Sequence, residues 1–392
     1  MKQSAHGKSL TVSILSLSLL TVMAGAAVAP ALGVIQAHFS SSNQLFIQMI
    51  ISVPALFIVI TNFIFPRLCR VFGSKTLVLI GLLLYTVGGC AAGLFDNIFV
   101  VLIMRAFVGI GVGIIMPLST GLLSFYFSPE EQAGLMGHSS AMNQMGGVVA
   151  TLLSGLLANI SWRVSFLIYL MGLISIVLCL IYLPNDKITQ EGPAEEESAK
   201  EGTAGIFRAN IVYILAMFLL MSIFFIYPAN FAMETAAEGI IPHNYIAVIM
   251  ASMDFIAFLG GLLFVSAKKA LGRNTKFLAP VCFLAGYLLL AAAGGWAGTL
   301  IGSVFIGFAN GAGIPFIMTE ASMKAGKAAA TTVMPLISAA LYLAQFVSPV
   351  LMSIVRTIFG EGAAHLPYWF AVVLAVWFVL WSSLIPTGKE ER

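Results

Sequence analysis

The segment Met104–Gly113, with the sequence MRAFVGIGVG, places Arg105 in an apolar stretch and follows it with three alternating glycines. A charged side chain inside a bilayer costs about 3 kcal/mol or more, so it persists only beside a partner or a watery cavity. Closely spaced glycines let the backbone of another helix approach. The segment therefore indicates a membrane protein with many spans and a polar pathway, which is typical of a transporter.

The composition agrees with this interpretation. The chain is 60% hydrophobic and 9% charged, with a mean hydropathy of +1.01, which excludes an ordinary soluble domain. Its apolar runs are long and continuous, whereas the spans of a β-barrel are short and alternating. No basic stripe suggests a nucleic-acid partner. No phosphate-binding loop, metal-ligand spacing or nucleophile–base pair stands out, so we expect neither a cofactor, a metal nor an enzyme.

The fold class predicted is an all-α polytopic membrane protein with twelve transmembrane helices in two pseudo-symmetric six-helix bundles. The apolar runs, each about the length of a span, fall at about 9–37, 45–66, 76–95, 98–127, 136–159, 163–183, 208–229, 243–266, 276–295, 298–319, 330–355 and 366–386. The first run follows two lysines and ends in small residues, as a signal peptide does. Because it extends to about residue 37 and many spans follow, we expect an uncleaved helix.

The domains predicted are a bundle at 1–183, a flexible linker at 184–207 and a second bundle at 208–392. The linker is rich in Glu and Lys and has no aromatic residue until Phe207, so it cannot bury enough apolar surface to fold. Lys and Arg gather in every second loop and in both tails. This bias predicts a multi-pass protein of the cell membrane with both termini in the cytoplasm.

The two halves repeat. In the fourth span Phe107, Gly109, Gly113 and Pro117 precede an identical residue of the tenth span at one constant separation; the partners are Phe305, Gly307, Gly311 and Pro315. The turn at 70–76 is echoed at 269–275. Parallel repeats of this kind predict two bundles with a substrate site between them near the midplane of the membrane.

With these motifs the chain resembles the major facilitator superfamily over essentially its whole length. Residues 66–75, PRLCRVFGSK, fall where that family carries the pattern G-x-L-x-D-R-x-G-R-[RK] between its second and third helices. Leu68, Gly73 and Lys75 fit this pattern. Pro66, Arg70 and Val71 replace its first glycine, its aspartate and the arginine after it. The resemblance implies a gating loop with the candidate residues Arg67, Arg70, Gly73 and Lys75.

The fourth helix also resembles the family pattern L-x-x-x-R-x-x-Q-G, with Arg105 and Gly109 in place and valines at positions 101 and 108. The family links that arginine to proton coupling. In the fifth helix, the glycines that mark family exporters are reduced to Gly155, followed by Trp162 and Arg163. The sequence as a whole is most similar to the twelve-helix drug–proton antiporter branch of the family.

Two charged residues are the first candidates for a substrate or proton pathway. Arg105 lies about 10 Å into its span at 1.5 Å per residue; it serves either the pathway or the bridging of helices. Asp254 is the only acid near the middle of a span, and it either exchanges protons or bonds a neighbouring helix. Glu320 is expected to be a solvated residue near the membrane surface, and Glu234 and Glu238 to be surface charges.

Uncharged polar residues at membrane depth complete the candidate set, because buried amides and hydroxyls either join helices or face a wet cavity. They are Asn143, Gln144, Asn310, Gln345, Tyr227 and Tyr342.

The leading function is proton-coupled efflux of small amphipathic compounds by alternating access. Uptake of a small organic anion by symport, with Arg105 as its counter-charge, is one alternative. A lipid-handling or non-transporting membrane protein on the same fold is another. The partners expected are a small-molecule substrate, protons and the lipid bilayer, and the chain is expected to be a monomer.

Overall fold

A computed structural model describes residues 3–187, 203–239, 241–293, 295–360 and 365–385. Most of these residues are helical, and no strand occurs among them. The α-helices and 3-10 helices (η) of the first 187 residues are α1 (Gln3–Ala26), η1 (Ala29–Ala31), α2 (Leu32–His38), α3 (Gln44–Val71), α4 (Ser74–Ala91), η2 (Ala92–Leu94), α5 (Ile98–Tyr126), α6 (Pro129–Ala158), α7 (Trp162–Ser165), η3 (Phe166–Leu170) and α8 (Met171–Tyr182). Those that follow are α10 (Thr203–Glu238), α11 (His243–Leu271), η4 (Gly272–Phe277), α12 (Leu278–Ala292), α13 (Gly295–Phe359) and α14 (Leu366–Leu384).

Eleven stretches of the described chain are long and apolar enough to cross a membrane. One of them, Asn244–Ala292, contains both α11 and α12 with the turn η4 between them. This stretch accounts for the difference from the twelve spans expected. The helix α13 covers the tenth and eleventh spans, as the stretches Gly295–Ala325 and Val333–Phe359. The prediction of an all-α, multi-pass membrane protein is confirmed.

The chain divides into two compact units, Met1–Gln190 with Thr235–Ala251, and Glu191–Glu234 with Ser252–Arg392. The first boundary falls inside the predicted linker, 184–207, most of which lies outside the described residues. The helix α10 already begins at Thr203, before the predicted start of the second bundle at residue 208. The limits of the bundles otherwise stay a prediction.

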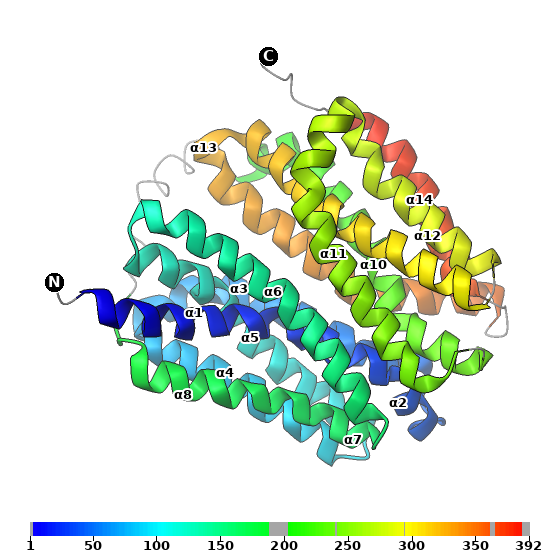
Figure 1. Ribbon diagram of the computed structural model, residues 1–392, viewed down its shortest axis with the longest axis horizontal. Coiled ribbons are helices and arrows are strands. Elements are labelled where there is room, and N and C mark those ends of the chain that lie inside the picture. The colour runs from blue at the N-terminus through cyan, green and yellow to red at the C-terminus, as the bar shows by residue number, and fades with distance from the viewer. Residues whose placement is uncertain (1–2, 188–202, 240, 294, 361–364, 386–392) are drawn as a thin grey trace. The chain divides into compact units, whose positions relative to one another are not determined.

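In the first unit α5 is the central helix and packs against α1, α3 and α4 (Figure 1). The first span is broken: α1 ends at Ala26, and the short 3-10 helix η1, which contains Pro30, leads into α2. In the second unit α12 packs against both α13 and α14.

The two units repeat the same helix contacts. A Cβ atom at Gly88 in α4 would lie 2.8 Å from the carbonyl oxygen of Met104 in α5. The corresponding contact in the second unit joins Gly286 in α12 to the carbonyl oxygen of Gly302 in α13, at 2.9 Å. Both positions therefore need glycine, because any side chain there would push the helices apart. These paired contacts are what a duplicated bundle produces.

Candidate functional site

Arg105 is the largest fully buried side chain of the structure, with 0% of its surface exposed. Its Nε donates a hydrogen bond to the carbonyl oxygen of Ile50 in α3 at 2.7 Å. Its two terminal nitrogens donate to the hydroxyl of Tyr169 in η3 and to the carbonyl oxygen of Ala24 in α1. The Tyr169 hydroxyl also donates to the Ala24 carbonyl at 2.9 Å. One guanidinium therefore joins the first, second, fourth and sixth spans.

Both backbone acceptors of Arg105 are explained by breaks in helices. The Ile50 carbonyl would ordinarily accept a hydrogen bond from the residue four positions later, but that residue is Pro54, which has no N–H group. The Ala24 carbonyl lies in the last turn of α1, where helical carbonyls lack intrahelical partners. The protein thus supplies two backbone acceptors to a buried cation without adding an acidic side chain.

Two tyrosine rings lie in the surroundings of Arg105. The Cζ atom lies 5.3 Å from the centroid of the Tyr169 ring, and Tyr169 meets Tyr85 edge to face at 5.1 Å. The five donors of an arginine spread over a planar fork, so they reach separated acceptors that the three donors of a compact lysine ammonium group do not. Tyr169 was missed in the sequence because a tyrosine in an apolar span carries no sign of its hydrogen-bond partner.

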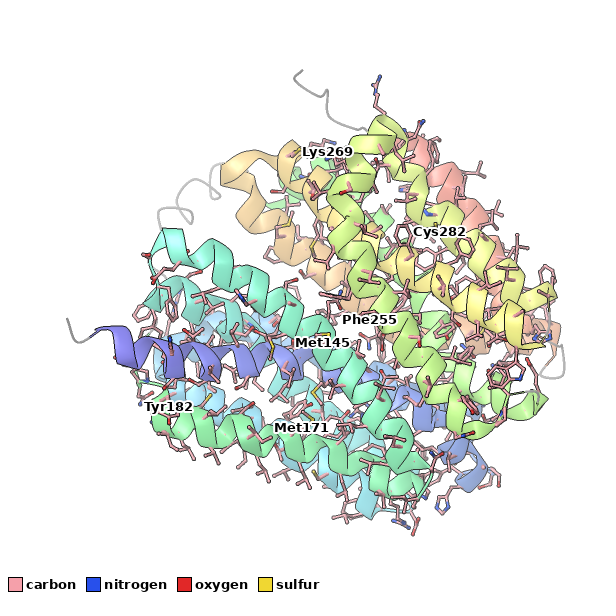
Figure 2. The ribbon with its side chains drawn as sticks, viewed as in Figure 1. Met145, Met171, Tyr182, Phe255, Lys269 and Cys282 are labelled. Atoms are coloured by element: carbon pink, nitrogen blue, oxygen red, sulfur yellow. The ribbon has the colours of Figure 1, made fainter. Side chains whose placement is uncertain are left out.

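Asp254 belongs to α11 and is partly exposed. It lies within electrostatic reach of Tyr227 in α10, whose side chain is 0% exposed. Figure 2 labels its neighbour Phe255 near the middle of α11, so the acid lies about midway along this helix. Asp254 and Tyr227, chosen separately from the sequence, are therefore near one another.

The Tyr227 hydroxyl has a defined hydrogen-bond direction. Its oxygen lies 2.7 Å from Ser303 Oγ, and Ser303 donates its own proton to the Thr299 carbonyl at 2.7 Å. A serine hydroxyl has one proton, so Tyr227 is the donor in the tyrosine–serine bond. Ser303 occupies the position of Arg105 in the repeat. The first half therefore carries a cation where the second half carries a hydroxyl.

The remaining polar candidates lie on α6 and α13. Asn143 in α6 accepts a hydrogen bond from Thr21 in α1, and Gln144 beside it is partly buried. Asn310 in α13 has a buried side-chain oxygen without a hydrogen-bond partner among the described residues. Gln345 is buried and Tyr342 partly buried, both farther along α13. Asn143 thus joins two helices, as one of its two interpretations required.

The predicted gating loop is held by the segment after the sixth span. Arg67 and Arg70 are exposed near the end of α3, and Gly73 is the N-cap residue of α4. A glycine has no side chain to cap the helix, and the side-chain oxygen of Asn185 accepts from the Thr76 backbone N–H at 3.3 Å instead. Lys75 Nζ donates to the Leu180 carbonyl at 2.7 Å.

Asp186 completes this attachment. Its carbonyl accepts a hydrogen bond from the Ser74 N–H at 2.8 Å, and its carboxylate accepts one from the Tyr126 hydroxyl at 2.7 Å. The described beginning of the predicted linker is therefore bound to the loop between α3 and α4. This contact joins residues about 110 positions apart, and no motif in the sequence indicates it.

Two expectations about acids were wrong. Glu320 is 4% exposed and forms an ion pair with Lys268 at 2.8 Å, so it is not a solvated residue. Glu234 is 22% exposed and pairs at 3.5 Å with Arg356, which is itself buried and bonded to Asn230. Both partners lie on other helices, far away in the sequence. The residues next to each acid in the sequence therefore did not predict its burial or its ion pair. Glu238 is exposed, as expected.

A further charged cluster lies between spans. Asp96, in the loop before α5, accepts hydrogen bonds from Arg163 and, at 2.9 Å, pairs with His38 at the end of α2. The hydrogen bond from Arg163, and then that from His38, holds the pKa of the Asp96 carboxyl below its ordinary value.

A helical membrane protein with two related halves and buried charges in its spans has the architecture of a secondary transporter. The family model of the Major Facilitator Superfamily matches residues 14–349. The chain therefore belongs to this superfamily, and its membership indicates a transporter.

Parts of the chain are similar in sequence to individual proteins of known function. Multidrug resistance protein 3 of Bacillus subtilis is 24% identical over 219 residues, which are 52% of this chain and 42% of that protein. Quinolone resistance protein NorA of Staphylococcus aureus is 25% identical over 116 residues, which are 29% of this chain and 30% of that protein. The chain thus spans less than half the length of these curated relatives.

A solved structure has the same fold. The crystal structure of the nucleoside transporter NupG has a TM-score of 0.75 at 14% identity, covering 96% of this chain and 98% of that one. At this identity the likeness concerns the fold alone.

Proposed function

We propose that this transporter exports small amphipathic compounds from the cell in exchange for protons, by alternating access. The observation that carries the proposal is the placement of Asp254. It is a partly exposed acid in the middle of a span, near a fully buried tyrosine hydroxyl. An acid at this depth is costly to ionise without a cation or water, so its affinity for a proton can differ between the two orientations of the transporter.

In the proposed cycle Asp254 takes up a proton from the outside and releases it to the cytoplasm, while the substrate moves outward. One proton crossing the membrane yields about 2.3 kcal/mol per 100 mV, with any pH gradient in addition. A cationic or donor-bearing substrate competes with the proton for the carboxylate. The likeness to two drug-resistance proteins supports export as the direction.

Arg105 has a supporting part in this proposal. Its guanidinium is fully buried and already bonded to Ile50, Ala24 and Tyr169. Binding an organic anion would require these bonds to open. For this reason we place anion symport second, and we assign to Arg105 the task of holding the broken first span in register with its neighbours.

The test uses the purified chain in proteoliposomes that contain a pH-sensitive dye, with a panel of amphipathic drugs and organic acids. The proposal expects proton movement opposite to that of the drug, and none with the acids. Proton movement in the same direction as an organic acid would favour symport. No proton movement with any transported compound would refute proton coupling.

A further inference from the structure

The helix α6 has an exposed polar face in the first half of its span. Of the stretches long enough to cross a membrane, Gly134–Ala158 is the least apolar. Its exposed residues near the start are Gly134, Gly137, His138 and Ser140. The exposed face of α8, by contrast, consists mainly of Leu, Ile and Val, which suit a lipid environment. A histidine inside a span almost always faces the bundle interior or a water-filled cavity, so this face of α6 meets water.

The His138 ring is held in one tautomer. Its Nδ1 lies 2.7 Å from the carbonyl oxygen of Gly134, one turn earlier in the helix. A carbonyl oxygen only accepts hydrogen bonds, so Nδ1 carries the proton, and Nε2 of the neutral ring keeps its lone pair. Histidines that bind metal ions almost always donate their other ring N–H to a backbone carbonyl, a carboxylate or water. The His138 ring is therefore oriented to bind an ion through Nε2.

Two methionines follow His138 on the same side of the helix. Met142 is four positions further on and Met145 seven, so the three side chains lie within about 60° of one another around the axis. Adjacent members of the set are about 5 to 6 Å apart along the helix at 1.5 Å per residue. Both methionines are partly exposed, and Figure 2 labels Met145 near the middle of α6. Their unbranched side chains are flexible enough to bring a sulfur atom toward a shared ligand.

The approach to this face is open at its start. A Cβ atom added at Gly134 or at Gly137 would meet no atom within 4 Å. Glu131 lies two turns before His138 on the same side, but its carboxylate accepts a hydrogen bond from the Ser128 hydroxyl at 3.0 Å. The donors that this face offers around His138 are thus an imidazole nitrogen and two thioether sulfur atoms, all of them neutral.

This set of donors selects one class of metal ion. Thioether sulfur is a soft ligand that favours Cu(I), and imidazole also binds copper, whereas Mg²⁺ and Ca²⁺ need oxygen ligands. Ag(I) has the same charge as Cu(I) and the same preference for soft ligands. The described residues contain no group of three His, Cys, Asp or Glu that could hold a metal ion. The spacing of those residue types in the sequence likewise predicted no metal, but it takes no account of methionine sulfur.

We propose that His138 Nε2 and the sulfur atoms of Met142 and Met145 form a binding site for a soft monovalent metal ion, Cu(I) or Ag(I), on the exposed face of α6. The pattern of positive charges predicts that α6 begins on the cytoplasmic side, so the site would receive its ion from the cytoplasm. The inference concerns binding alone. It uses neither Asp254 nor Arg105 and does not depend on the proposed function.

The experiment uses Ag(I), which keeps one oxidation state in air. The purified full-length chain, with its four cysteines replaced by alanine, is titrated with silver nitrate in a chloride-free buffer and followed by calorimetry. In parallel, NMR of the chain labelled with ¹³C at the methionine methyl groups reports which sulfur atoms bind. We expect the first Ag(I) ion to shift the methyl signals of Met142 and Met145. The signal of Met136, on the opposite side of α6, should stay in place.

Matched variants separate this site from the other methionines of the chain. M142L keeps the volume of the side chain but removes a sulfur atom, so it should weaken Ag(I) binding about tenfold or more, as should H138A. M136L makes the same substitution on the opposite side of the helix and should bind as the parent chain does. M142H should add Zn(II) binding, because two histidines four positions apart on one helix face bind this ion.

If H138A does not accumulate in membranes, M142L and M142H provide the same comparison. Equal affinity of M142L and the parent chain for Ag(I) would overturn the site. So would a first ion that shifts the Met136 signal and leaves those of Met142 and Met145 unchanged. Because the titration needs neither a substrate nor a gradient, its result is separate from that of the transport assay.

Discussion

The Nε atom of Arg105 donates a hydrogen bond to the carbonyl oxygen of Ile50 at 2.7 Å, across two neighbouring helices. That carbonyl is free of the helical ladder because Pro54 follows it by four residues. Two residues about 50 positions apart are therefore linked. The proline leaves a backbone carbonyl without its helical donor, and the arginine of the next helix donates a hydrogen bond to that carbonyl.

Replacing Pro54 with alanine tests this link between the proline and the hydrogen bond of Arg105. Replacing a proline inside a helix ordinarily removes a penalty of about 3 kcal/mol. The new N–H at position 54 would compete with Arg105 for the Ile50 carbonyl, so we expect P54A to gain about 1 kcal/mol less stability than P66A. P66A, in the same helix, is the matched control, since no arginine bonds the carbonyl four residues before it in the described structure. Thermal unfolding in detergent measures both. Equal effects of the two variants would show that the Arg105 contact contributes nothing through Pro54.

Substitution of Arg105 separates its two possible roles. R105A should abolish proton-driven transport while the protein still inserts, and R105K should restore only part, because one ammonium group cannot satisfy three separated acceptors. Y169F removes one acceptor of the guanidinium and should give a smaller loss than R105A. Membrane content is measured alongside transport. Failure of R105A to accumulate in membranes would show that the bonds of Arg105 are needed for the bundle to form and not only for transport.

How far the sequence predicted the surroundings of a buried charge depends on the kind of partner that the charge has. A lone arginine in an apolar span had to be buried with a partner, and the structure places it so. Its acceptors are mainly backbone carbonyls, which every residue carries, and only Pro54 hints at one of them. Glu320 shows the opposite failure. Lys324 lies close to it in the sequence and suggested a solvated cluster, but its partner Lys268 is 52 residues away on another helix.

The helices themselves were predictable for a physical reason. An apolar run of about 20 residues has one stable form in a bilayer, so length and hydropathy decide it. The short connections were harder. The turn between α11 and α12 is a six-residue 3-10 helix, Gly272–Phe277, which continues the helical run and merges two spans into one stretch.

The N-terminus of α4 provides a prediction about the linker. N185A should cost about 1 kcal/mol of stability, because the helix would lose the side chain that caps it in place of Gly73.

Deleting part of Glu191–Lys200, which lies outside the described residues, should leave transport nearly intact as long as the remaining chain is long enough to connect the two bundles. Transport and thermal unfolding are measured for both. A large loss from the deletion, with normal insertion, would refute the interpretation of that segment as a linker.

Asp96 predicts a dependence on pH. Its pKa is held below the ordinary value of 3.8 by hydrogen bonds, first from Arg163 and then from His38. A depressed pKa contributes stability that is present above the ordinary value and is lost as the pH falls through the folded value. D96N should therefore unfold more easily at neutral pH and lose less stability on acidification than the parent chain. Parallel melting curves from neutral to acidic pH would contradict this.

Asp254 is the residue proposed to exchange the proton that drives transport. The most direct measurement is uphill movement of an amphipathic fluorescent cation, such as ethidium, in proteoliposomes carrying a pH gradient, with the parent chain and D254N compared. We expect D254N to bind ethidium still and to equilibrate it down its own gradient, because the amide keeps the size and polarity of the side chain. The variant should no longer accumulate ethidium against that gradient. Accumulation by D254N equal to that of the parent chain would remove Asp254 from the coupling mechanism.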